Sequence, residues 1–167
     1  DSAYNDRRKS CENVAAAICK HHPEVKSLRD ANYELLDEVR GEVSKEDALR
    51  AHYVIGEKER VMMVSAALET EDYEEVGAKM YETHDGLSRE YEVSCPELDF
   101  LVDVARDCGV SGARMMGGGF GGCTINLVSQ ELYANFIEKA RVSYQEKFGI
   151  APVVIDVVIG DGARKLC

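Results

Sequence analysis

The chain has 167 residues, of which 45% are hydrophobic, and its formal net charge of −11 arises from 20 Lys and Arg against 31 Asp and Glu. This length is sufficient for one domain with its own hydrophobic core. No apolar run reaches the ~18 residues that a membrane span requires. The acidic balance argues against a nucleic-acid or membrane-surface binder, although a small phosphorylated ligand, held by local groups, remains compatible with it.

Neither cysteines nor histidines indicate a metal site. No cysteine pair has Cys-x-x-Cys spacing and no Cys/His cluster has zinc-finger spacing, so we expect buried free thiols in a reducing compartment. The histidines, Asp85 and Asp99 fall in or beside helical stretches, where we interpret the carboxylates as solvated. The chain begins with Asp1 and has no signal-peptide pattern, which fits either a processed end or a piece of a longer protein.

Helical signals dominate the first 110 residues. An apolar stripe with helical spacing begins at Cys11 and is broken by Pro23. A short helix is expected over residues 28–39. Ser44 followed by Asp47 resembles a capping box and predicts the start of a long helix.

Two more helices are expected before residue 110. One covers residues 71–89 and is interrupted by Gly77 and Gly86. The other begins at residues 94–97, where Ser94 is placed to cap it and a proline lies in the first turn. Glycine at position 109 ends it.

The last third of the chain has a different character. Residues 112–122 are rich in glycine, and residues 124–128 alternate and are β-branched, which predicts a strand. Ser129 then caps a helix, and the apolar run over residues 153–159 predicts a buried strand. We therefore expect one α+β domain that spans residues 1–167.

The most site-like feature is a run of five glycines in six residues. It consists of Gly117, Gly118, Gly119, Phe120, Gly121 and Gly122. Its G-x-G-x-x-G spacing is not a dinucleotide fingerprint, because the run leads into a strand and not into a helix. It is not a P-loop either, because Cys123 stands where the lysine is required.

Such a run needs a physical reason. Each glycine costs roughly 0.5–1 kcal/mol relative to alanine, which is justified by tight turning, by close approach of another backbone, or by close approach of a phosphate. Successive backbone N–H groups can form an anion-binding nest. From the residues alone, a packed glycine hairpin and an anion site remain equally open.

A second cluster lies near the N-terminus. Tyr4 has a ring and a hydroxyl that suit a polar ligand, although an aromatic anchor for the first helix is equally compatible. Arg7 and Arg8 favour a solvated helix start or surface ion pairs. Arg114, just before the glycines, is the better phosphate candidate, and an ion pair with one of the many carboxylates is its alternative.

Four stretches carry a resemblance to a known family. Residues 112–124 (GARMMGGGFGGCT) resemble the third conserved motif of the GHMP small-molecule kinases in its galactokinase form. Residues 2–8 resemble the galactokinase segment just after the sugar site, residues 92–99 resemble the stretch before the motif-bearing region, and residues 160–164 resemble the C-terminal ending. The four matches follow the family's order and cover the whole chain.

The resemblance implies both a fold and a reaction. The fold is a ferredoxin-like α+β C-terminal domain, with an antiparallel sheet packed with helices. The implied full-length protein is a cytoplasmic enzyme that transfers the γ-phosphoryl group of ATP, with Mg²⁺, to the C1 hydroxyl of galactose. Its partners are galactose, ATP and its own N-terminal domain, with no nucleic acid and no membrane.

The resemblance also assigns roles to residues. Tyr4 matches a tyrosine that contacts galactose, and residues 117–122, together with Arg114, match a loop that supports the phosphate loop of the other domain. The family's sugar-binding motif, Ser-rich phosphate loop and catalytic Asp and Arg do not occur in this sequence. We therefore expect no catalytic and no metal-binding residue here, and no kinase activity from this chain alone. An N-acetylgalactosamine kinase and a non-catalytic galactose-sensing paralogue remain alternatives.

Overall fold

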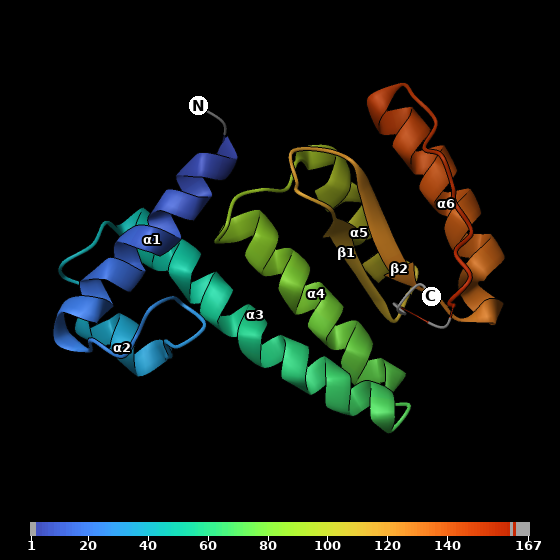
Figure 1. The fold of residues 1–167 in the computed structure, drawn as a ribbon. Helices are drawn as coiled ribbons and strands as arrows, with labels where there is room; N and C mark the ends of the chain where they lie inside the picture. Colours follow the sequence, from blue (N-terminus) through green and yellow to red (C-terminus); the bar gives the residue numbers. More distant parts are fainter. Residues whose placement is uncertain (1–2, 161, 163–167) are drawn as a thin grey trace, which may run out of the picture.

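The computed structural model describes residues 3–160 and 162, and it has six helices and one antiparallel hairpin (Figure 1). This confirms the predicted α+β class with an antiparallel sheet. None of the described helices has the length and apolarity that crossing a membrane demands. In chain order the elements are α1 (Ala3–His21), α2 (Tyr33–Glu38), α3 (Lys45–Glu69), α4 (Tyr73–Arg89), α5 (Pro96–Asp107), β1 (Gly112–Met116), β2 (Cys123–Leu127) and α6 (Gln130–Phe148).

Local caps set the beginnings of the early helices. The Ser44 side chain accepts a hydrogen bond from the Asp47 N–H at 3.0 Å, as predicted for the start of α3. The helix expected over residues 28–39 is shorter, because the Asn32 side chain caps it by accepting from the Leu35 N–H at 2.9 Å. The residues before Asn32 form turns instead.

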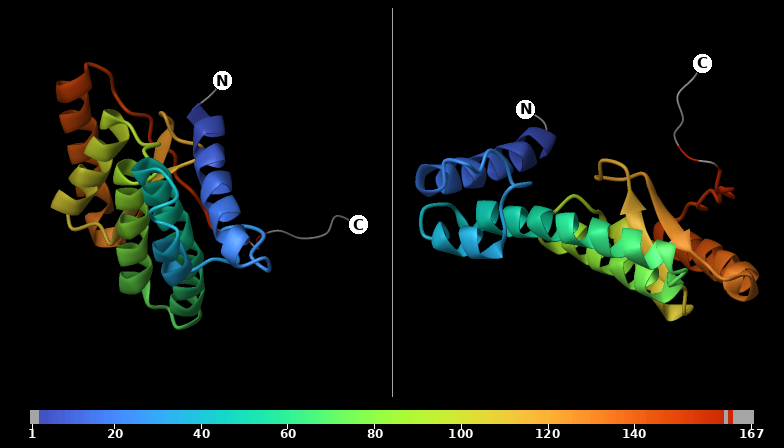
Figure 2. Two further views of the ribbon diagram at one scale, coloured as in Figure 1. Left: turned by 90° about the vertical axis from the view of Figure 1, so that its left-hand side faces the viewer. Right: turned by 60° about the horizontal axis from the view of Figure 1, so that its bottom comes forward.

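The N-terminal half has its own apolar core. Ile18 of α1, Leu36 of α2 and Ile55 of α3 are fully buried in one cluster. Figure 2 shows α1 and α2 at one end of the molecule and the hairpin and α6 at the other, with α3 and α4 running between them. The long helices therefore run between this core and the apolar clusters at the hairpin end of the molecule.

The glycines of α4 do not interrupt it, contrary to the prediction. A Cβ at Gly77 would overlap the Ser111 carbonyl, just before β1. A Cβ at Gly86 would overlap the ring of Tyr53 on α3. Both glycines are explained by close packing against neighbouring elements.

The helix α5 begins where the sequence predicts, but with a different cap. Cys95 is the N-cap residue and provides no side-chain hydrogen bond. The Ser94 hydroxyl, which was expected to cap the helix, donates to the Asp99 carboxylate at 2.5 Å instead.

The hairpin joins β1 and β2 in an antiparallel register that pairs Gly112 with Leu127 and Met116 with Cys123. The strand predicted over residues 124–128 is confirmed as β2, whereas β1 was not anticipated within the glycine-rich region. One face of β1 is buried against a second core, formed by residues from α5, β1 and α6. Its members include Val102, Ala105, Ala113, Phe136 and Ala140.

The prediction of a strand over residues 153–159 is wrong. This segment follows α6 without forming a strand, and the side chains of Val153, Ile155, Val157, Val158 and Ile159 are between 74% and 94% exposed. In the described part of the chain no strand lies hydrogen-bonded beside it, so its β-prone sequence has no partner for its backbone groups. Within the C-terminal motif, residues 161, 163 and 164 lie outside the described residues, as does residue 2 of the N-terminal stretch.

The free thiols are less buried than expected. Cys11, Cys19, Cys95 and Cys108 are only partly buried, and Cys123 is exposed at the start of β2. The prediction of buried thiols is therefore wrong for Cys123, because the strand pairing turns its side chain away from the core. The sixth cysteine, at position 167, lies outside the described residues.

Candidate functional site

The glycine loop, residues 117–122, connects β1 to β2 and has an unusual backbone. Its positive φ angles are +90° at Gly117, +86° at Gly119, +130° at Gly121 and +105° at Gly122. Residues with side chains rarely adopt these angles, so glycine is required at four positions for conformational reasons alone. The run is therefore explained first by tight turning.

Close approach explains the remaining glycine. Gly118 has no positive φ, but a Cβ there would overlap the hydroxyl of Tyr4. At Gly119 a Cβ would in addition overlap the carbonyl oxygen of Val93. The loop therefore lies against two segments that are remote in sequence.

Phe120 fixes the loop at its centre. Its φ is +60°, which is uncommon for a residue with a side chain. Its N–H donates to the Val93 carbonyl at 2.7 Å. Its ring lies edge-on to the Tyr4 ring, with the centroids 6.0 Å apart, and the Arg7 guanidinium carbon is 5.5 Å from its centroid.

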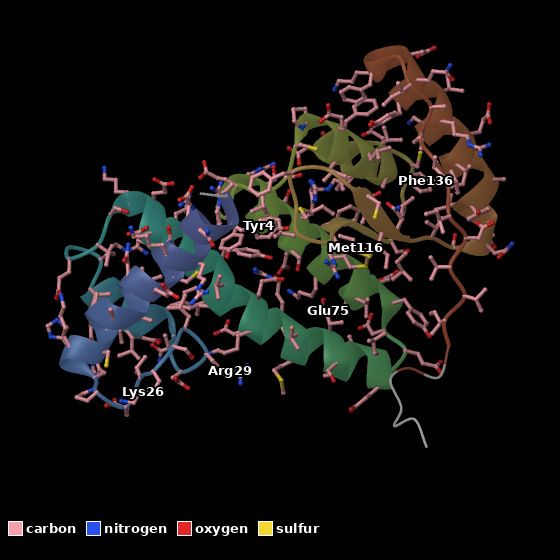
Figure 3. All side chains as sticks on the ribbon, turned by 45° about the horizontal axis from the view of Figure 1, so that its top comes forward. Tyr4, Lys26, Arg29, Glu75, Met116 and Phe136 are labelled. Atoms are coloured by element: carbon pink, nitrogen blue, oxygen red, sulfur yellow. The ribbon has the colours of Figure 1, made fainter. Side chains whose placement is uncertain are left out.

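The structure brings together two groups that the sequence treats separately. Tyr4 lies in the first turn of α1, whose N-terminal end approaches the hairpin (Figures 1 and 3), and it is 56% exposed. Its hydroxyl meets the loop at Gly118 and its ring meets Phe120. The exposed tyrosine and the glycine loop thus form one continuous surface.

Arg7 is a residue whose role the sequence interpretation missed. The sequence favours a solvated helix start or a surface ion pair for it, but only 13% of its side chain is exposed, and its Nη2 lies 4.0 Å from the Glu92 carboxylate. Its Nε donates to the Tyr91 carbonyl at 3.0 Å and its Nη2 donates to the Glu92 carbonyl at 2.5 Å. The i, i+3 spacing with Tyr4, which places both on one helix face, is the signal that would have found it.

Arg8 behaves as expected. Its Nε lies 2.7 Å from the Glu12 carboxylate, four residues along the same helix, and its side chain is 78% exposed. It is a surface ion pair that contributes little to stability.

Arg114 lies on β1 and not in the loop. Its half-buried side chain donates to the Met115 carbonyl at 3.2 Å, on the strand face opposite to the buried Ala113 and Met115. Among the described residues, no carboxylate forms an ion pair with Arg114 and no hydrogen bond joins its side chain to residues 117–122. Its proposed support of phosphates remains a prediction.

A buried histidine supports β1 from behind. His84 is 3% exposed, and its Nδ1 accepts a hydrogen bond from the Met115 N–H at 3.2 Å. Its Nε2 lies 3.2 Å from the Asp99 carboxylate, which also accepts from Ser88 at 3.0 Å and from Ser94. Burial lowers the pKa of His84, the Asp99 charge opposing this, so the ring is neutral at neutral pH and carries its proton on Nε2, because Nδ1 accepts from Met115. Asp99 is therefore a structural acceptor and not simply a solvated carboxylate.

The loop leaves backbone donors available. In the described part of the chain, the N–H groups of Gly118, Gly119 and Gly121 have no hydrogen-bond acceptor, which suits an incoming anion. A groove of about 310 Å³ runs beside the loop. Its lining residues are Cys95, Glu97, Leu98, Leu101, Phe120, Gly121, Gly122 and Tyr144. Among the described residues no group of three His, Cys, Asp or Glu side chains is arranged to hold a metal ion.

Comparison with known proteins decides the family. Residues 64–144, which contain the end of α3, all of α4 and α5, the hairpin and most of α6, match the family described as GHMP kinases C terminal. Residues 64–144 are thus similar to the C-terminal domain of the GHMP kinases, and this matched region includes every glycine of residues 117–122.

Individual relatives extend the match to 99% of the chain. Human galactokinase is 44% identical over 99% of this chain, and the Clostridium beijerinckii galactokinase is 39% identical over 99%. The chain spans 40% and 43% of the length of these two relatives. The crystal structure of Lactococcus lactis galactokinase complexed with galactose matches with a TM-score of 0.82 at 27% identity, covering 90% of this chain and 39% of that one.

Proposed function

We propose that this chain is the C-terminal part of a galactokinase, which transfers the γ-phosphoryl group of ATP to the C1 hydroxyl of galactose. The observation that carries the proposal is the contact between Tyr4 and the glycine loop at Gly118. A residue assigned to the sugar and a loop assigned to the phosphates must be neighbours in any enzyme that joins the two substrates. The galactokinase relatives, 38–44% identical to this chain, support the same reaction.

Tyr4 is the proposed contact to galactose from this chain. Its hydroxyl can donate and accept a hydrogen bond, and its ring offers an apolar face to a sugar. It is accessible, because more than half of its side chain is exposed.

The glycine loop is the proposed support of the phosphates. The free N–H groups of Gly118, Gly119 and Gly121 are donors for oxygens that carry negative charge. The absence of side chains at these positions also lets a second backbone approach closely, as the phosphate loop of an N-terminal domain would. Arg114 would add positive charge from β1.

ATP accompanied by Mg²⁺ is the proposed phosphoryl donor. We assign no magnesium ligand and no catalytic base to this chain, because the family motifs that would carry these groups do not occur in its sequence. Such groups would come from the N-terminal domain that we propose as its partner. We therefore expect the 167-residue chain alone to have no kinase activity. We propose the cytoplasm as its location and no nucleic-acid partner.

The test is a coupled ADP-release assay on the full-length protein with galactose, glucose, N-acetylgalactosamine and mevalonate. We expect turnover with galactose alone. Preferential turnover of N-acetylgalactosamine would instead support an N-acetylgalactosamine kinase. Binding of galactose and ATP without turnover would support a sensing paralogue, and galactose-dependent turnover by the isolated chain would contradict its proposed inactivity.

The contact assigned to Tyr4 has its own control. Tyr4→Phe removes only the hydroxyl, and we expect kcat/KM for galactose to fall about three- to tenfold, as for the loss of one hydrogen bond to a neutral group. Tyr73 is comparably exposed at 53% but lies in the first turn of α4. Tyr73→Phe is therefore expected to leave kcat/KM unchanged, and equal effects of the two variants would contradict the assignment.

A further inference from the structure

Arg7 connects the start of α1, the α4–α5 connection and the glycine loop, whose relative positions matter for the proposed reaction. Its guanidinium edge donates to the carbonyls of Tyr91 and Glu92, in the connection between α4 and α5. Its guanidinium face lies over the ring of Phe120 in the glycine loop, with 5.5 Å between the guanidinium carbon and the ring centroid. Its backbone belongs to the same helical turn region as Tyr4.

The connection that Arg7 holds is itself in a strained conformation. Glu92 has a φ of +54°, which is unfavourable for a residue with a long side chain. Two arginines hold it from different helices: Arg7 takes its carbonyl, and Arg50 of α3 lies 3.2 Å from its carboxylate. The Arg50 side chain is only 6% exposed, which makes it a rigid support.

Val93, the residue after the strained Glu92, contacts the glycine loop. The Val93 carbonyl faces the glycine loop, where it accepts the Phe120 N–H at 2.7 Å. It also lies where a Cβ of Gly119 would be. The position of the loop is thus set by the conformation at Glu92, and Arg7 contacts both.

We infer that Arg7 is a positioning residue for phosphoryl transfer: it fixes the glycine loop relative to Tyr4 so that the phosphates and the sugar are held in register. This inference rests on the proposed function. In the described part of the chain no hydrogen bond joins the Arg7 side chain to Tyr4 or to the free amides of the loop, and Arg7 acts through Phe120 and the Tyr91–Glu92 carbonyls.

A lysine cannot replace this arginine. The guanidinium offers two donors along one edge and a flat face for the aromatic ring at the same time. An ammonium group retains the charge, but it cannot hold both carbonyls while stacking on Phe120. Arg7→Lys therefore tests the geometry separately from the charge.

The experiment uses Arg7→Lys with Arg8→Lys as its matched control, because Arg8 is exposed and Glu12 is its one ion-pair partner among the described residues. Amide hydrogen exchange of residues 117–122 is measured in this chain, and kcat and the KM for galactose and ATP are measured in the full-length protein. Misplacing reacting groups by about 1 Å can cost around a hundredfold in rate. We expect Arg7→Lys to raise exchange of the Phe120 amide at least tenfold and to lower kcat between ten- and a hundredfold. The KM values should change less than threefold, because the contacts to each substrate remain.

A second variant keeps the test decisive if Arg7→Lys folds poorly. Phe120→Leu removes the aromatic ring but leaves the rest of the loop, and Phe120 is 47% exposed and lies outside the core. We expect it to lower kcat by a similar factor, and the double variant should be no worse than either single one, because both break one connection.

Three outcomes would overturn the inference. One is wild-type kcat in Arg7→Lys, another is a loss of kcat that Arg8→Lys reproduces, and the third is additive losses in the double variant. An inactive wild-type protein would contradict the proposed function itself. In that case the exchange of the Phe120 amide still reports whether Arg7 holds the loop.

Discussion

The hydroxyl of Tyr4 occupies the space in which a side chain at Gly118 would begin. Gly118 is the one loop glycine whose need is purely steric, because the other four all have positive φ angles. A residue in the first turn of α1 is therefore in direct contact with the loop between β1 and β2, and this pair is accessible to substitution.

Gly118→Ala tests this contact. We expect the new methyl group to displace Tyr4 from the loop and to lower stability by about 1 kcal/mol, because Tyr4 is half-exposed and moves outward at small cost. The measurement is thermal unfolding, together with proteolysis of the N-terminal turn, which should become faster.

The control is the same substitution in a Tyr4→Ala background. With the tyrosine side chain removed, the three atoms nearest to the new methyl group are gone, so Gly118→Ala is expected to destabilise the protein much less there. An equal destabilisation in both backgrounds would contradict the contact.

Gly77→Ala tests the packing of α4 on β1. Alanine in a helix is ordinarily better than glycine by about 1 kcal/mol, but here the Cβ would overlap the Ser111 carbonyl. Because backbone atoms cannot move aside cheaply, we expect a net loss of about 1–3 kcal/mol, read as a lower midpoint of thermal unfolding.

Gly41→Ala is the matched control for Gly77→Ala. Gly41 has open space around its Cβ position and no positive φ. Alanine there should be neutral or stabilise the fold by about 0.5 kcal/mol through the unfolded chain. Equal shifts in both variants would mean that α4 does not approach β1 as described.

Stability should depend on the protonation of His84. Burial lowers its pKa in the folded state, so the unfolded chain binds the proton more readily. The contribution of this group is therefore complete above the unfolded pKa of about 6.5, and it is lost progressively as the pH falls below that value. Protonation at Nδ1 would also oppose the Met115 N–H.

His84→Asn isolates this effect, because an amide oxygen can still accept from Met115 but does not titrate. Chemical denaturation at several pH values should show a smaller loss of unfolding free energy between pH 7 and pH 5 in the variant than in the wild type. Parallel curves for the two proteins would exclude His84 as the cause.

The exposed segment after α6 should tolerate polar substitution. Val157 is 74% exposed and Val158 is 92% exposed, so Val157→Thr and Val158→Thr are each expected to change stability by less than about 0.5 kcal/mol. Val102→Ala, at a residue that is 1% exposed, should cost about 1–3 kcal/mol. A loss of that size at Val157 would contradict its exposure and would support the buried strand that the sequence predicts.

The elements that were predicted correctly are those with local causes. The start of α3 follows from a serine and its own third neighbour, Asp47, and β2 follows from its alternating residues. The strand β1 was missed because its glycine and its two methionines have little β preference, and its pairing with β2 and its support by His84 decide its structure. The run over residues 153–159 has strong β preference but lacks a neighbouring strand.

The candidate site was half predictable for the same reason. The glycines stand out in the sequence because their composition is unusual, and Tyr4 is identified through the family resemblance. The role of Arg7 depends on carbonyls 84 and 85 residues away. The i, i+3 spacing places Arg7 on the helix face of Tyr4, but it does not identify those carbonyls. The unusual backbone conformation of Phe120, with a φ of +60°, likewise cannot be inferred from the sequence and is seen only in the structure.

The apolar cores are local in sequence, whereas the contact of Tyr4 with the glycine loop is not, and this difference sets an order of folding. The buried members of the first core lie within residues 14–55 and those of the second within residues 102–140, so the contacts of both cores close short loops and are expected to form early. The contact of Tyr4 with Gly118 joins two residues that lie far apart in the sequence, and it needs the finished hairpin. During synthesis the first turn of α1 can therefore pack against the loop only after most of the chain has been made. The same contact is expected to be among the first to open when the protein unfolds.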